Sequence, residues 1–202
     1  MLTIGLTGNI SSGKSTVSSY LKNVGARIID ADQVSRDIVH PGAPALKEIA
    51  AYFGPGVLTP DGALDRKKLG ALVFTNPEAM EVLNGITHPR IVEVIEEEKK
   101  SLAALAGNGP GMLVIDAPLL IETGLHKEVD EVWVVTIEPE EQIRRLMKRD
   151  NISEGEAKSR IDSQMTQQEK IKHAQVIIDN NGTPADAISQ VRKRLDAYSS
   201  RI

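Results

Sequence analysis

The feature that most constrains this chain is the segment GNISSGKS, residues 8–15, which fits the pattern G-x-x-x-x-G-K-[ST]. Gly8 and Gly13 allow a tight turn in which backbone N–H groups point inward. Together with the N-terminus of the next helix, these groups form a positive cradle for a polyphosphate. Lys14 then reaches the β- and γ-phosphates, and the Ser15 hydroxyl is a ligand for Mg²⁺. The segment predicts a phosphate-binding P-loop.

The residues on either side have the structure that a P-loop requires. Residues 2–7 are short, partly β-branched and bounded by glycine, so they predict a strand. Residues 14–21 predict a helix with Val17, Tyr20 and Leu21 on one face. The alternative is a glycine-rich turn that binds nothing, which the order strand, loop, helix disfavours.

Size and composition exclude several classes of protein. A chain of 202 residues suits a single α/β domain with smaller inserted parts. The net charge of −4 and the few aromatic residues argue against nucleic-acid binding, and no apolar stretch approaches the ~20 residues that cross a bilayer. The absence of cysteine excludes disulfides and thiolate metal sites. The chain opens on a strand without a basic region before an apolar run, so we expect no signal peptide and a cytoplasmic protein.

Acidic residues follow the second and third predicted strands. Residues 27–29 form a strand parallel to the first and end in Asp30-Ala31-Asp32. Either carboxylate can cap the next helix, an interpretation left open for Asp30; for Asp32 we favour proton acceptance from an attacking hydroxyl. Residues 112–116 end in Asp116, a candidate Mg²⁺ ligand of the Walker B kind, and Glu122 is a further candidate acid in the same cleft. Strands over 131–137 and 176–178 complete a five-stranded parallel sheet.

Two parts of the chain between strands are predicted to be purely helical. Residues 41–105 form an insertion, broken or kinked near Thr87-His88-Pro89-Arg90, that suits either a second substrate or a helical cap without a ligand. His88 is equally a core histidine or a ligand contact. From Pro139, one helix carries Arg145 and Arg149, and a capping box of Ser153 and Glu156 starts another with Lys158, Arg160 and Gln164. We favour a basic lid here over a solvated basic face.

These features together define a phosphotransferase. A GTPase switch would need an N-K-x-D motif, which the sequence lacks. A nucleotide sensor without catalysis would have no use for Asp32 or for the basic lid.

The chain resembles the dephospho-CoA kinase family over nearly its whole length. The resemblance is carried by the P-loop and by a series of short motifs: Gly5-Leu6-Thr7-Gly8, Ile29-Asp30-Ala31-Asp32, Pro41-Gly42, Thr87-His88-Pro89, Pro118-Leu119-Leu120 with Glu122, Arg145 with Arg149-Asp150, Arg160-Ile161 with Gln164, and Asp179-Asn180-Asn181-Gly182. It implies a three-layer α/β P-loop kinase core like that of nucleoside monophosphate kinases. That core spans residues 1–33, 106–138 and 174–202, with a helical CoA-binding region over 34–105 and a lid over 139–173.

The resemblance also implies an activity: ATP-dependent phosphorylation of the ribose 3′-hydroxyl of dephospho-CoA, the last step of coenzyme A biosynthesis. It makes Asp32 the general base, places Arg145 and Arg149 at the phosphates, and adds Mg²⁺ as cofactor, held by Ser15. Asp116 remains a candidate second ligand from the Walker B pattern, not from the resemblance. The implied ATP-binding residues are Gly8, Ser11, Ser12, Gly13, Lys14, Ser15, Thr16, Asn181 and Gly182. The implied acceptor-binding residues are Thr7, Asp32, His88, Pro118 and Leu119. We expect a monomer whose partners are these small molecules, with no nucleic acid and no membrane.

The P-loop departs from the family pattern at two positions. Asn9 and Ser11 stand where glycine or another small residue is usual. Because asparagine tolerates left-handed backbone angles, we expect the loop to keep its shape.

Overall fold

The computed structural model describes residues 1–73, 76–105 and 111–199. The chain divides into two compact units, which are described separately. The sheet unit comprises residues 1–29 and 106–202, and the helical unit comprises residues 30–105. The sequence predicts a surface loop over residues 106–111, of which 106–110 lie outside the described residues. No helix among the described residues is long and apolar enough to cross a membrane.

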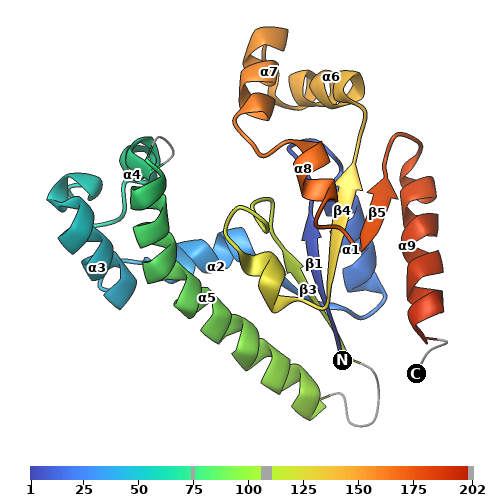
Figure 1. Ribbon diagram of the computed structural model, residues 1–202, viewed down its shortest axis with the longest axis horizontal. Coiled ribbons are helices and arrows are strands. Elements are labelled where there is room, and N and C mark those ends of the chain that lie inside the picture. Colours follow the sequence, from blue (N-terminus) through green and yellow to red (C-terminus); the bar gives the residue numbers. More distant parts are fainter. Residues whose placement is uncertain (74–75, 106–110, 200–202) are drawn as a thin grey trace. The chain divides into compact units, whose positions relative to one another are not determined.

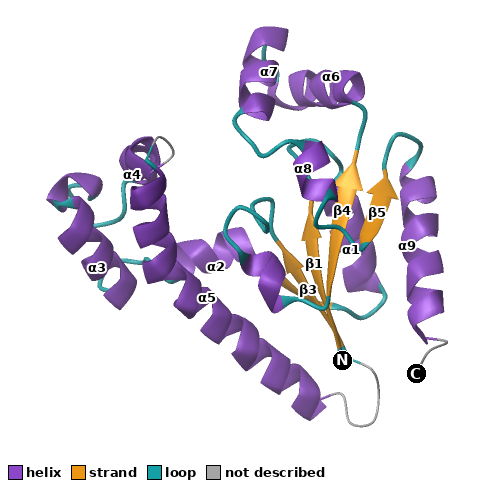
Figure 2. Ribbon diagram, viewed as in Figure 1, coloured by secondary structure: helices purple, strands orange, loops and turns teal. Residues whose placement is uncertain are grey.

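The sheet unit is built on five strands, as the sequence predicts (Figures 1 and 2). The strands lie in the order β2-β3-β1-β4-β5, and β1 pairs in parallel with β3 and β4, as β4 does with β5. Their bounds are β1 Leu2–Thr7, β2 Arg27–Asp30, β3 Met112–Asp116, β4 Glu131–Thr136 and β5 Val176–Asp179. Because carboxyl ends of parallel strands meet at one edge, the loops after β1, β3, β4 and β5 share that edge.

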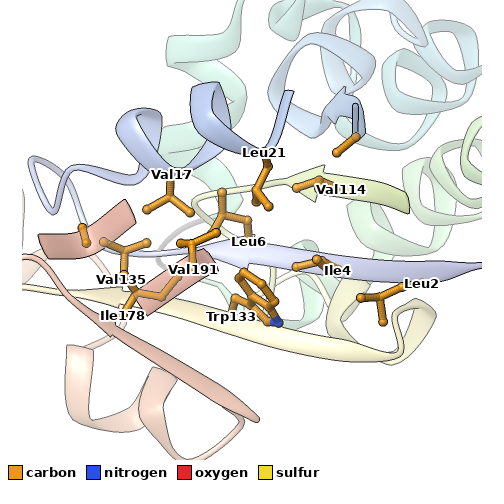
Figure 3. Packing of buried hydrophobic residues seen from close by; sticks show 12 residues of the cluster. Leu2, Ile4, Leu6, Val17, Leu21, Val114, Trp133, Val135, Ile178 and Val191 are labelled. Carbon is orange, nitrogen blue, oxygen red and sulfur yellow. The ribbon is translucent and has the colours of Figure 1, made fainter. Parts of the chain in front are cut away.

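One face of the sheet is covered by α1 (Lys14–Asn23) and α9 (Pro184–Ser199). Figure 3 shows the core between these helices and the sheet, in which Val17 and Leu21 of α1 contact residues of the strands. Trp133 of β4 is fully buried there, and its indole N–H donates to Glu131. All six residues of β1 are buried, as expected for a central strand of a parallel sheet. This packing holds the loop between β1 and α1 on a rigid base.

The helical unit has a core of its own. It contains α2 (Ala31–Asp37), α3 (Pro44–Phe53), α4 (Arg66–Val73) and α5 (Pro77–Leu105). Ile49 of α3 and Leu69 of α4 are buried in this core, with Leu83 of α5 packed against them. The sequence predicts a helix over residues 44–53 that Gly54 ends, and α3 has these bounds, because Pro44 starts the helix and Gly54, with φ of 84°, ends it.

The predicted break near Pro89 is wrong, because α5 runs through that residue, and the alternative of a kink there stays a prediction. Proline removes one backbone donor from the helix interior. Two nearby side chains donate to other carbonyls of this part of the helix. The Thr87 hydroxyl lies 2.9 Å from the Leu83 carbonyl oxygen, and the Arg90 guanidinium donates to the Ile86 carbonyl.

Three helices follow β4 in the region predicted as a lid. They are α6 (Pro139–Asp150), α7 (Glu154–Asp162) and α8 (Gln167–Ile171). The capping box of Ser153 and Glu156 is confirmed. The placement of Gln164 in the same helix is wrong: α7 ends at Asp162, where Ser163 donates its hydroxyl to the Arg160 carbonyl. A second capping box then starts α8, so Gln164 lies in a connection between two helices.

Candidate active site

The P-loop has the tight form that its two glycines allow. A Cβ atom on Gly8 would lie 2.6 Å from the Ser12 hydroxyl and 2.8 Å from the Val135 carbonyl oxygen. Gly13 has φ of 90°, and a Cβ there would lie 1.9 Å from the Asn180 amide nitrogen. Any other residue at either position would collide with its surroundings. Both glycines therefore serve the loop's shape, as the motif predicts.

Besides Gly13, the P-loop has a left-handed residue at Ser11, with φ of 60°, and not at Asn9, where the tolerance of asparagine for such angles was expected to matter. The side chain of Asn9 is instead buried and donates to the Met165 carbonyl at 2.8 Å. Within the described residues, the hydroxyls of Ser11 and Ser12 are buried and have no hydrogen-bond partner. Unpaired buried polar groups are rare, so these two hydroxyls are suited to a polar ligand in the loop.

Lys14 and Asp116 are brought together. The Lys14 ammonium forms an ion pair with the Asp116 carboxylate, and both side chains are largely buried. Lys14 begins α1 and Asp116 ends β3, which is paired in register with β1. The sheet therefore holds the P-loop lysine beside the acid of the neighbouring strand, as in a Walker A and Walker B pair.

Next to the loop lies a pocket of about 400 Å³ between α1 and α9. Ser15 and Thr16 line its end nearest the P-loop, and Ser19, Tyr20, Asn23 and Ile188 line the rest. Ser15 and Thr16 thus border open space, and Ser15 is exposed.

Both backbone groups of Ile10, in the middle of the P-loop, are held by glutamine side chains from the lid region. Gln142 of α6 donates to the Ile10 carbonyl at 2.8 Å, and the Gln164 amide oxygen accepts from the Ile10 N–H at 2.8 Å. Sequence reasoning missed Gln142 altogether. Its only signal was a polar residue on the buried face of α6, where it is 6% exposed.

The loop after β5 contacts the P-loop through Asn180, which belongs to the 179–182 motif but was not among the predicted ATP-binding residues. Asn180 is buried and donates its amide to the Ser12 carbonyl at 2.7 Å. Its own carbonyl accepts from Arg145 of α6 at 3.1 Å. Arg145 is thereby placed next to Gly13.

The neighbouring residues Asn181 and Gly182, which were predicted to bind ATP, do not share the contacts of Asn180 with the P-loop. The Asn181 side chain accepts from the Glu138 N–H and donates to Asp179. Gly182 packs against Asp186, which caps α9 together with Thr183. Both residues shape the turn after β5.

Arg149 is not in the same network as Arg145. Its guanidinium pairs in a bidentate manner with Asp150, at 2.7 and 3.1 Å, and Arg160 of α7 contacts the same carboxylate. These cations lower the pKa of Asp150, and Asp150 raises the pKa of Arg149. Similarly, Arg144 and then Arg145 lower the pKa of Glu141 to about 2. The basic residues of α6 and α7 are thus partly neutralised by acids of the same helices.

The segment after β3 is tied to β1 and to α8. The carbonyl of Pro118 accepts from the Thr7 hydroxyl at 3.1 Å and from the Lys170 ammonium at 2.7 Å. Glu122 pairs with Lys170, so this candidate acid has a counter-ion in the structure. Leu119, the adjacent candidate, is half-buried. Lys170 was missed because nothing in its local sequence marks a buried lysine.

Asp32 and His88 both lie in the helical unit. Asp30 caps α2, with its carboxylate accepting from the Gln33 N–H at 3.0 Å. Asp32 is exposed in the first turn of the same helix. Arg66 of α4 reaches α2 by donating to the Ser35 carbonyl at 3.2 Å. His88 is half-buried in α5.

A parallel five-stranded sheet carrying a P-loop, a paired lysine and acid, and an arginine at the loop define a P-loop kinase. The family model for dephospho-CoA kinase matches residues 2–186. The chain therefore belongs to the dephospho-CoA kinase family, whose members are transferases.

Individual relatives agree with this assignment. A dephospho-CoA kinase of Carboxydothermus hydrogenoformans is 48% identical over 188 residues, covering 93% of this chain and 90% of the relative. The solved dephospho-CoA kinase of Campylobacter jejuni matches with a TM-score of 0.65 at 32% identity, covering 98% of this chain and 97% of that one. A solved protein from Thermus thermophilus matches with a TM-score of 0.80 at 30% identity, with the same coverage of both chains.

Proposed function

We propose that this enzyme transfers the γ-phosphoryl group of ATP to the ribose 3′-hydroxyl of dephospho-CoA, giving CoA and ADP. The observation that carries the proposal is the P-loop, which contains Lys14 and two buried hydroxyls that have no hydrogen-bond partner among the described residues. Such a loop accepts the oxygens of a polyphosphate, and membership of the dephospho-CoA kinase family supports the choice of acceptor.

The ATP phosphates would lie in the loop of residues 8–16. Its N–H groups and the hydroxyls of Ser11 and Ser12 supply donors, and Lys14 supplies a positive charge. Arg145, held at the loop by the Asn180 carbonyl, is placed to neutralise charge on the transferring group. Arg149 would join it on lid closure by leaving Asp150, and substitution Arg149→Ala should then lower kcat.

The residues around the P-loop fit Mg²⁺ bound together with the nucleotide. No group of three or more acidic or histidine side chains that could hold a metal ion occurs in the described part of the chain. Mg²⁺ does not require one, since it usually keeps water and takes phosphate oxygens with one or two protein oxygens. Ser15 and Asp116 would supply these. The bound ion would neutralise charge on the β- and γ-phosphates.

Asp32 is the proposed general base. Its carboxylate would accept the proton of the 3′-hydroxyl while that oxygen attacks the γ-phosphorus and ADP leaves. Its exposure in the first turn of α2 leaves it accessible to a substrate, and Asp30, rather than Asp32, caps that helix. The remainder of the acceptor would contact the helical region over residues 34–105, including His88, and also Thr7, Pro118 and Leu119. We expect a cytoplasmic, monomeric enzyme.

The proposal is tested by an ADP-release assay with Mg-ATP, comparing dephospho-CoA, AMP, CMP and no acceptor. We expect release that depends on dephospho-CoA, with CoA identified as product by its 3′-phosphate. Release with AMP or CMP alone would keep the phosphotransferase and overturn the acceptor. ATP binding without release for any acceptor would contradict the proposal and favour a nucleotide sensor.

Asp32→Asn tests the base. The variant should bind ATP normally and lose at least ~10²-fold in kcat, the usual contribution of a general base. Near-normal turnover would assign proton removal to another group.

A further inference from the structure

Among the residues that the structure describes, Lys170 on α8 is the most deeply buried charged residue that the proposed chemistry does not use. Its side chain is 0% exposed. The ammonium lies 2.7 Å from the Pro118 carbonyl oxygen and 2.8 and 3.0 Å from the two oxygens of Glu122. An ammonium has three protons to donate, and these three acceptors match that number.

Stability alone is a weak reason for such a residue. Burying an ammonium costs its hydration, and an apolar side chain of similar volume often serves stability as well or better. The pair does, however, fix directions, because an ammonium with three partners leaves its acceptors little freedom. The role of Lys170 therefore depends on where its hydrogen-bond partners, the Pro118 carbonyl and the Glu122 carboxylate, lie in the structure.

Both hydrogen-bond partners of Lys170 belong to the segment of residues 117–122, which begins directly after Asp116, the last residue of β3. The same Pro118 carbonyl also accepts from Thr7, the last residue of β1 before the P-loop. The connection leading into α8 supports the P-loop itself, through Gln164 and Met165. One short stretch, residues 164–170, thus holds both the phosphate loop and the segment that carries two proposed acceptor contacts.

We propose that Lys170 is a positioning residue for the phosphoryl acceptor, dephospho-CoA. Through the Pro118 carbonyl and Glu122, it fixes the segment of residues 117–122 in the conformation to which dephospho-CoA binds. This inference rests on the proposed function. Lys170 itself is enclosed by protein and acts through these two residues rather than by touching substrate.

The test compares four proteins: wild type, Lys170→Met, the double variant Lys170→Met/Glu122→Gln, and the control Lys172→Met, whose lysine is exposed. Lys170→Met leaves the Glu122 carboxylate without its counter-ion and should lower the melting temperature. The double variant removes both charges and should recover most of that loss. Dephospho-CoA binding is measured by calorimetry, and KM is measured for each substrate.

We expect the Kd and KM for dephospho-CoA to rise at least tenfold in both Lys170 variants, with the KM for ATP within threefold of wild type. The control should match wild type throughout. If the double variant has wild-type acceptor affinity, Lys170 is only structural and the inference fails. An equal rise in the KM for ATP would also contradict it.

Failure of the proposed function is recognised separately, in the wild type alone. If wild type neither binds nor phosphorylates dephospho-CoA, the proposed function falls, and the acceptor role of Lys170 falls with it. If wild type is active and the variants are unaffected, only the inference on Lys170 is overturned.

Discussion

His126 makes the stability of the sheet unit depend on pH. Burial is the main cause that lowers its pKa, and the neighbouring His173 adds to it; their rings lie 5.0 Å apart. Within the described residues, Nδ1 of His126 is buried without a hydrogen-bond partner, which disfavours a second proton on the ring. The neutral ring is therefore favoured by folding.

The sign of the effect follows from linkage. The unfolded chain binds the proton near pH 6.5 and the folded chain only at lower pH, so the stabilisation is complete above pH 6.5 and is lost as the pH falls below it. We expect the free energy of unfolding, from urea titrations, to fall less between pH 7.5 and 5.5 in His126→Gln than in wild type. His40→Gln, at an exposed position, is the control. Equal pH dependence in all three proteins would refute this role.

Asn180 and Asn181 give competing predictions about the nucleotide site. Asn180→Ala leaves the Ser12 carbonyl without its buried donor, a loss of about 1–3 kcal/mol in stability. Because the P-loop loses its support, we expect the Kd for ATP to rise about tenfold, the equivalent of ~1.4 kcal/mol. Asn181→Ala, on the exposed turn, should have the smaller effect on the Kd. A larger rise in the Kd for ATP in Asn181→Ala than in Asn180→Ala would support the sequence-based prediction that Asn181 binds ATP.

The helix α6 and the connection before α8 brace the P-loop through Ile10. Gln142→Ala and Gln164→Ala each remove one hydrogen bond to its backbone, and each should lower the free energy of unfolding by about 0.5–1.5 kcal/mol. Since the two glutamines hold one residue, their effects on the KM for ATP should not be additive in the double variant. Gln168→Ala, exposed on α8, is the control. Additive effects would mean that the two contacts act independently.

Local sequence signals were sufficient for most elements. Pro44 with Gly54 bounded α3, and Ser153 with Glu156 marked the start of α7, because caps and breakers act within one turn of the chain. The continuous α5 was missed because an internal proline removes one backbone donor and usually indicates a helix end, whereas α5 continues through Pro89.

Some residues of the candidate site could be predicted from local sequence, and others could not. The P-loop and its Lys14 are a contiguous motif, so the sequence alone predicts them. Asn180, Gln142 and Lys170 contact residues that are 168, 132 and 52 positions away along the chain, so only the folded structure brings them to the site. A polar residue at such a position has the same local appearance as one in solvent.

Two separate hydrophobic cores underlie the two units. Residues such as Leu6, Trp133 and Val191 form the core of the sheet unit, and residues such as Ile49 and Leu69 form that of the helical unit. The P-loop, Lys14 and Arg145 all belong to the sheet unit, whereas Asp32 and most of the proposed acceptor region belong to the helical unit. Each substrate should therefore stabilise chiefly one of the units.

Hydrogen exchange measured by mass spectrometry tests this division. A ligand present at 100 times its Kd adds about 2.7 kcal/mol to the state that binds it, which slows opening of the unit that holds it. With Mg²⁺ and a non-hydrolysable ATP analogue, we expect slower exchange in β1, α1 and α6, and unchanged exchange in α3 and α4. Dephospho-CoA alone should slow exchange in the helical unit and in residues 117–122. If the ATP analogue protects α3 and α4 as strongly as α1, the two units open together, and their separate cores do not give them independent stabilities.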